Sequence, residues 1–118
     1  MKSTRLTRSP AVSVVIPLYN EEKHISRAID SVLRQTFQEY ELLVVDDGSQ
    51  DYGARVVSSF SDPRIRLIQQ ENQGPGAARN RGVRESRGEF LAFLDADDEW
   101  LPDFLATSLC HLARYPGC

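Results

Sequence analysis

The sequence Phe90-Leu91-Ala92-Phe93-Leu94-Asp95-Ala96-Asp97-Asp98 joins an apolar run directly to three carboxylates within four residues. The apolar run is typical of a buried strand. Carboxylates this close together repel one another, so their charged forms need water, a basic side chain or a metal ion to offset them. Divalent ions such as Mg2+ and Mn2+ prefer oxygen ligands and commonly bind through one or two carboxylates together with substrate phosphates. The segment also fits a second interpretation, in which the acids solvate a loop or cap the helix that begins at Pro102.

A second acidic pair supports the interpretation as a ligand site. Asp46-Asp47 follows another apolar run, residues 42–45. Ligands bind at the carboxyl ends of parallel strands in open α/β sheets. Two acidic strand ends in one short chain therefore favour a site at this edge. The alternative is that Asp46 and Asp47 only organise the turn at Gly48 and cap the next helix.

Strand and helix patterns alternate along the chain. The expected strands cover residues 12–16, 41–45, 65–68 and 90–94. The expected helices are one capped by Asn20, a short one capped by Ser49 or Asp51, one from Ala77 to Ser86, and one from Pro102 to Tyr115. This alternation predicts an α/β fold with a doubly wound, mainly parallel sheet and helices on both faces. Residues 1–10 are expected to form a disordered leader, and residues 11–118 one domain.

Composition narrows the class of protein. At 118 residues, 41% hydrophobic and 26% charged, the chain fits one soluble globular domain, and disordered, collagenous and membrane classes are excluded. It has no apolar stretch of roughly 20 residues that could span a bilayer and no apolar signal-peptide region, so we expect a cytoplasmic location. Cys110 is expected to be a small core residue of the last helix.

The net charge of −3 conceals an asymmetry between two adjacent segments. Residues 74–88 carry four arginines and one glutamate, whereas residues 89–103 carry six acids and no base. A solvated helix face is the usual explanation of such an arginine group. The pattern also suits a metal-bound anionic substrate, whose phosphate oxygens contact both arginine and metal. Nucleic acid is not an expected partner, because the chain is acidic and does not interleave aromatic with basic residues.

Four motifs together resemble a known family. They are VVIPLYNE at residues 14–21, VDDGS at 45–49, GAARN at 76–80 and FLDADD at 93–98. In this order they are similar to the nucleotide-sugar half of a family-2 inverting glycosyltransferase with the GT-A fold, and the resemblance covers about residues 11–115. It implies a UDP-sugar donor, Mn2+ or Mg2+ as cofactor, and a polysaccharide, a lipid carrier or a protein as acceptor. The parent of such a domain can be membrane-associated.

The resemblance also implies roles for individual residues. Asp97 would bind the metal ion, and Asp95 would contact the ribose or a metal-bound water, so the two form the expected metal site. Tyr19 would lie against the nucleobase. Asp47, with or without Asp46, would accept the imide hydrogen of uracil or a ribose hydroxyl. Arg79 would bind near a phosphate, although a surface salt bridge explains it almost equally well. Pro17 and Glu21, in the first motif, complete the expected donor-binding set.

One part of an inverting transferase has no candidate in this sequence. The transfer needs a general base for the acceptor hydroxyl, and the resemblance places that carboxylate beyond Cys118. We therefore expect a truncated chain that is inactive alone, whose exposed apolar surface could drive homo-oligomerisation. The alternative function is a non-catalytic nucleotide-binding or interaction module. A receiver domain is excluded because Lys2 and Lys23 are the only lysines, and a dinucleotide fold is disfavoured because residues 17–20 replace its glycine-rich turn.

Overall fold

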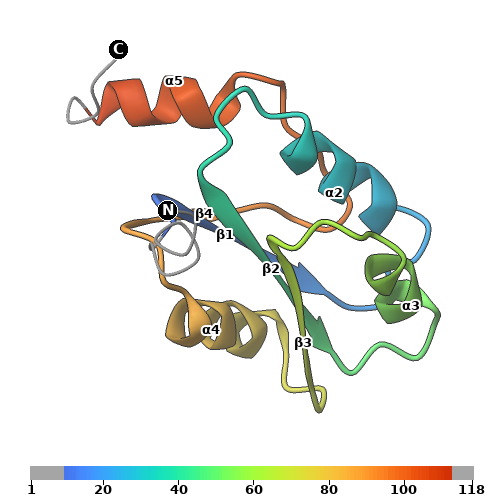
Figure 1. Cartoon of the computed structure of the whole chain (residues 1–118). Helices are drawn as coiled ribbons and strands as arrows, with labels where there is room; N and C mark the ends of the chain where they lie inside the picture. Colours follow the sequence, from blue (N-terminus) through green and yellow to red (C-terminus); the bar gives the residue numbers. More distant parts are fainter. Residues whose placement is uncertain (1–9, 113–118) are drawn as a thin grey trace.

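A parallel sheet forms the centre of the computed structural model, which describes residues 10–112. The elements in chain order are β1 (Val12–Leu18), α2 (Ile25–Leu33), β2 (Tyr40–Asp47), α3 (Gly53–Ser58), β3 (Ile65–Gln70), α4 (Pro75–Glu85), β4 (Phe90–Phe93) and α5 (Phe104–His111). The strand order is β3-β2-β1-β4, and each neighbouring pair is parallel (Figure 1). The predicted doubly wound α/β fold is confirmed. Residues 1–9 of the expected leader and residues 113–115 of the expected last helix lie outside the described residues.

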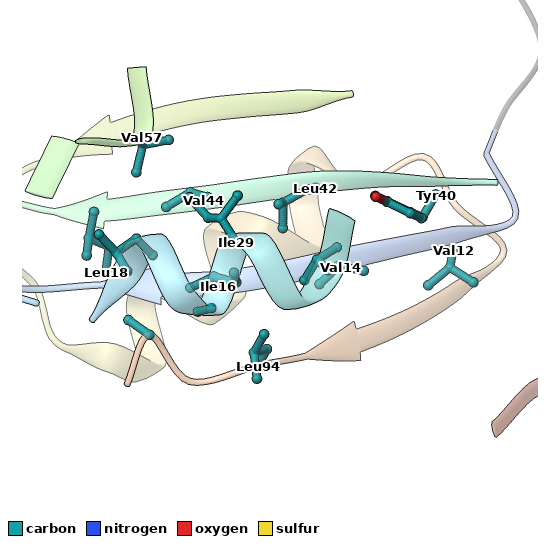
Figure 2. Packing of buried hydrophobic residues seen from close by; sticks show 14 of the residues in the cluster. Val12, Val14, Ile16, Leu18, Ile29, Tyr40, Leu42, Val44, Val57 and Leu94 are labelled. Atoms are coloured by element: carbon teal, nitrogen blue, oxygen red, sulfur yellow. The ribbon is translucent and has the colours of Figure 1, made fainter. Parts of the chain in front are cut away.

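Successive residues of the central strands face two separate apolar layers, because side chains alternate along a strand. Val14, Ile16, Leu42 and Val44 pack with Ile29 of α2 in the larger cluster (Figure 2). The opposite face of β1 and β2 packs against α4 in a smaller cluster of Val15, Leu43, Val45, Ile68 and Ala78. Figure 1 shows α4 on one side of the sheet and α2 and α3 on the other.

The last strand differs from the prediction of a buried strand. Leu91 and Phe93 of β4 are 42% and 45% exposed, so this prediction was wrong. Within the described residues β4 is an edge strand that pairs with β1 alone, and α4 packs over β1 and β2 instead. Only the other face of this region is covered, where Leu94 and Ala96 enter the larger cluster. Cys110, expected in the core, is also exposed.

Three boundaries differ from those expected, all near the carboxyl edge of the sheet. Strand β1 continues through Pro17, which pairs with Val45. Leu94 N donates to Val15 O, which shows that the main-chain groups of residue 15 point toward β4. Those of residue 17 point the same way but lie beyond the end of β4, so a proline at 17 removes no hydrogen bond between the strands. Strand β2 includes Asp46 and Asp47. Helix α2 begins at Ile25 rather than after Asn20, which has a positive φ of 51°.

None of the helices in the described part of the chain has both the length and the apolar character needed to cross a membrane.

Candidate functional site

A cleft of about 500 Å³ lies at the carboxyl edge of the sheet. It contains seven of the eight site residues predicted from the sequence: Pro17, Tyr19, Glu21, Asp47, Arg79, Asp95 and Asp97. They come from the ends of β1 and β2, the start of α4 and the turn after β4. The strand order reverses between β1 and β4, and ligands bind at such switch points in α/β sheets. The eighth residue, Asp46, does not line the cleft.

The Asp95–Asp97 turn presents its carboxylates to solvent. Asp98 N donates to Asp95 O at 3.0 Å, which closes the turn, and Ala96 is anchored in the core. The flanking Asp95 and Asp97 are both exposed. Arg79 from α4 places its guanidinium 3.6 Å from Asp95 Oδ1, so a basic group faces the acidic turn across the cleft. The charge asymmetry of the sequence is thus brought together in space.

The carboxylates of this turn suit a hard divalent cation whose other ligands come from water and from a substrate. Carboxylate oxygens suit Mg2+ and Mn2+, which bind through one or two carboxylates and complete their shells with water and phosphate. Between residues 10 and 112 no group of three His, Cys, Asp or Glu side chains is placed to hold a metal ion. Asp95 and Asp97 would therefore supply only part of a coordination shell.

Asp47 has a very different environment at the floor of the cleft. Its side chain is buried, and each carboxylate oxygen accepts two hydrogen bonds. Oδ1 accepts from Gln70 Nε2 at 3.0 Å and Gln73 N at 2.8 Å, and Oδ2 from Asn72 Nδ2 at 3.2 Å and Gly74 N at 2.9 Å. Burial alone would raise the pKa of Asp47, but the hydrogen bonds from Gln70, Gln73 and Gly74 outweigh it, and the pKa lies below its ordinary value.

Asp46 organises the turn, as one interpretation of the sequence allowed. Its Oδ1 accepts from Ser49 N at 3.0 Å and its Oδ2 from Gln69 Nε2 at 3.4 Å. Asp46 therefore stabilises the turn, whereas Asp47 lines the cleft.

The loops after β1 and β2 are joined by reciprocal hydrogen bonds that sequence reasoning missed. Asn20 N donates to Ser49 Oγ at 3.0 Å, and Asn20 Oδ1 accepts from Gln50 N at 2.8 Å. Asn20 was predicted to cap a helix, but its side chain instead accepts a hydrogen bond from the loop after β2. The link fixes the backbone next to Tyr19, a residue that is 45% exposed and lines the cleft. The motif Tyr19-Asn20 was visible in the sequence, but its partner in the second loop was not.

Asn72 and Gly74 also line the cleft and were not predicted. They belong to the loop between β3 and α4, where the sequence signal was a turn before Pro75. The hydrogen bonds of Asp47 hold this loop against the end of β2.

Most of the chain is similar in sequence to one family of known proteins. The sequence profile of the family described as Glycosyl transferase family 2 matches residues 13–116. The Escherichia coli enzyme UDP-Glc:alpha-D-GlcNAc-diphosphoundecaprenol beta-1,3-glucosyltransferase WfgD is 46% identical over 104 residues, which are 87% of this chain and 41% of WfgD. The chain spans less than half the length of the curated relatives that it matches.

Two solved structures share the fold. Staphylococcus aureus TarS 1-349 in complex with UDP superposes with a TM-score of 0.81 at 33% identity, over 86% of this chain and 32% of that one. The mannosyltransferase PcManGT of Pyrobaculum calidifontis, in complex with GDP-Man and Mn2+, gives a TM-score of 0.82 at 30% identity, over 93% of this chain and 34% of that one.

Proposed function

The chain belongs to glycosyltransferase family 2, and from this premise we propose that it binds a UDP-sugar with a divalent metal ion for inverting transfer of the sugar to an acceptor. The observation that carries the proposal is the cleft, in which an exposed aromatic ring, an arginine and two exposed carboxylates face one space. These three kinds of group match the three parts of a metal-bound nucleotide diphosphate: base, phosphate and cation.

Each side chain has a task that follows from its position. Tyr19 offers a ring face on which a base can stack. Arg79 can donate to a phosphate oxygen, and its separation of 3.6 Å from Asp95 leaves the pair free to open toward a ligand. Asp95 and Asp97 would hold Mn2+ or Mg2+, which supplies positive charge for the diphosphate leaving group.

The choice of uracil rests on Asp47. A carboxylate accepts the imide hydrogen of uracil but faces only an acceptor nitrogen on cytosine. The four hydrogen bonds of Asp47 occupy its acceptor positions, so one donor must move before the base can bind there. The named donors in similar proteins are UDP-Glc in WfgD and GDP-Man in PcManGT, which makes base preference a necessary part of the test.

Isothermal titration with UDP, with and without Mn2+, tests the site. We expect UDP to bind only with the metal and to outcompete CDP, ADP and GDP. Asp97→Asn should remove the metal-dependent binding, whereas the matched variant Asp98→Asn should keep it, because Asp98 does not line the cleft. Tight binding without metal, or equal loss in both variants, would contradict the proposed metal site.

The transfer step itself remains a prediction. The described acids that line the cleft are Glu21, Asp47, Asp95 and Asp97. Glu21 is paired with His24 at 2.7 Å, Asp47 is enclosed by its donors, and the other two form the proposed metal site. We therefore expect this chain alone to bind the donor without sustained transfer. Multiple-turnover transfer by the purified chain would show that it contains a base after all.

A further inference from the structure

Residues at and just after α2 hold the segment that follows the Asp95–Asp97 turn. Arg27 Nη2 donates to Asp97 O at 3.1 Å, and Arg27 Nε lies 3.0 Å from Glu99 Oε1. Ser31 Oγ, one helical turn further, accepts from Trp100 N at 3.1 Å. The two hydrogen bonds join residues that lie 70 and 69 positions apart in sequence.

Gln35 continues this row just beyond the end of α2. Its Nε2 donates to Leu101 O at 2.7 Å, and its Oε1 accepts from Leu105 N at 2.9 Å. Figure 1 shows the chain between β4 and α5 passing beside α2. Arg27, Ser31 and Gln35, which we call the α2 clamp, therefore touch the segment from the turn to the start of α5.

Two members of the clamp are buried polar side chains without a part in the cleft. Ser31 and Gln35 are 1% and 2% exposed. A buried polar group is costly unless its hydrogen bonds are made, and both side chains make theirs to the main chain of this one segment or of α2 itself. An apolar residue would satisfy the packing of a helix face equally well. Their polarity is thus explained by the segment that they hold.

The turn needs such support because its own anchors are few. Ala96 is buried, and Asp98 N bonds to Asp95 O, but the carboxylates of Asp95 and Asp97 project from an exposed turn. The residues around a metal site orient its ligands, and their loss typically lowers metal affinity about 10- to 100-fold. We propose that Ser31 and Gln35, assisted by Arg27, are positioning residues that fix the Asp95–Asp97 turn for metal and donor binding. This inference rests on the proposed function.

Ser31→Ala and Gln35→Met test the clamp, because each new side chain has nearly the same size as the original but cannot make its hydrogen bonds. We expect the affinity for UDP in the presence of Mn2+ to fall about tenfold in each variant. Ser31→Thr, which retains the hydroxyl, should restore affinity to near that of the unaltered chain. Val32→Ala is the matched control, because Val32 is buried on the same helix and contributes only to the core. It should lower the thermal midpoint while leaving the affinity of the folded protein unchanged.

Amide hydrogen exchange without metal or nucleotide supplies a second readout. The Asp98 N–H closes the turn by donating to Asp95 O and makes no hydrogen bond to Ser31 or Gln35, the two residues that are altered. Its exchange should accelerate in Ser31→Ala and Gln35→Met, while the Leu94 amide, bonded to Val15 O at the end of β4, should keep its rate. Unchanged Asp98 exchange together with unchanged affinity would overturn the clamp. If the unaltered chain fails to bind UDP with Mn2+, the proposed function is wrong, and Asp98 exchange alone still decides whether the clamp orders the turn.

Discussion

Two acidic pairs end two strands of one sheet, yet their surroundings are opposite. Asp46-Asp47 is buried and accepts hydrogen bonds on every carboxylate oxygen. Asp95 and Asp97 are exposed, and Arg79 Nη2 lies 3.6 Å from Asp95 Oδ1. The first pair holds loops together, and the second presents exposed carboxylate oxygens. Similar sequence patterns can thus supply the frame of a site and its ligand-binding groups.

The difference follows from what lies beyond each strand. β2 is a central strand, and the loop after β3 folds over its end, so donors from residues 70–74 surround Asp47. β4 is an edge strand in the described chain, and the turn after it is held by the buried Ala96 and by the hydrogen bond from Arg27 to Asp97 O. A carboxylate enclosed by donors stabilises the fold, whereas an open one remains available for a cation.

The largest expected effect separates the two pairs by stability. Asp47→Asn replaces an acceptor oxygen by a donor amide among four existing donors, and we expect the free energy of unfolding to fall by about 2 to 4 kcal/mol. Asp97→Asn should change it by less than about 0.5 kcal/mol, because the residue is exposed. Urea denaturation followed by circular dichroism measures both. Equal effects would show that Asp47 and Asp97 do not differ in their contribution to stability.

The second effect concerns the backbone next to Asp47. Gly48 has a positive φ of 75°, and an added Cβ would lie 2.8 Å from Asn72 N, a main-chain atom. Gly48→Ala should therefore lower the free energy of unfolding by about 2 kcal/mol. Gly76→Ala is the control near the start of α4, where an added Cβ meets nothing within 4 Å and should be neutral or stabilising by up to about 1 kcal/mol. A tolerated Gly48→Ala would mean that the β3–α4 loop is not held against β2.

The third effect is the pH dependence of the Asp47 contribution. Its pKa is lowered in the folded protein from an ordinary value of 3.8. The stabilisation is thus fully present above pH 3.8 and is lost as the pH falls through the depressed pKa. The difference in unfolding free energy between the unaltered chain and Asp47→Asn should shrink over that acidic range. Gly48→Ala retains the carboxylate, so its deficit should not shrink for this reason, and parallel behaviour of the two variants would count against the assignment.

The smallest expected effect on stability concerns the exposed ion pair between Arg79 and Asp95. Arg79 and Asp95 have side chains 43% and 65% exposed, so Arg79→Gln should change the free energy of unfolding by less than about 0.5 kcal/mol. The same change should weaken UDP binding with Mn2+ by about tenfold, since a charged hydrogen bond to phosphate is lost. Arg84→Gln, on an exposed part of α4 outside the cleft, should leave binding unchanged. Similar losses in both variants would indicate only a general charge effect.

The fold class and the edge of the sheet on which the site lies follow from local sequence patterns. Apolar runs and helical spacing are local patterns, and parallel strands place their carboxyl ends together whatever the details of packing. The motifs therefore predicted that residues 17–22, 46–49 and 95–98 meet at one edge, where Tyr19, Asp47, Asp95 and Asp97 line the cleft. The same local patterns could not show that β4 is partly exposed, since an apolar run has no information on what covers it.

Which acids are enclosed and which are exposed depends instead on contacts between residues far apart in the sequence. The donors to Asp47 come from residues 23 to 27 positions away, and the clamp on the Asp95–Asp97 turn comes from about 70 positions away. Asn20 likewise exchanged a predicted local cap for a partner 30 residues distant. Hydrogen-bond partners of buried polar groups are chosen by the packing of whole elements, because each group must be satisfied by whatever the fold brings within reach.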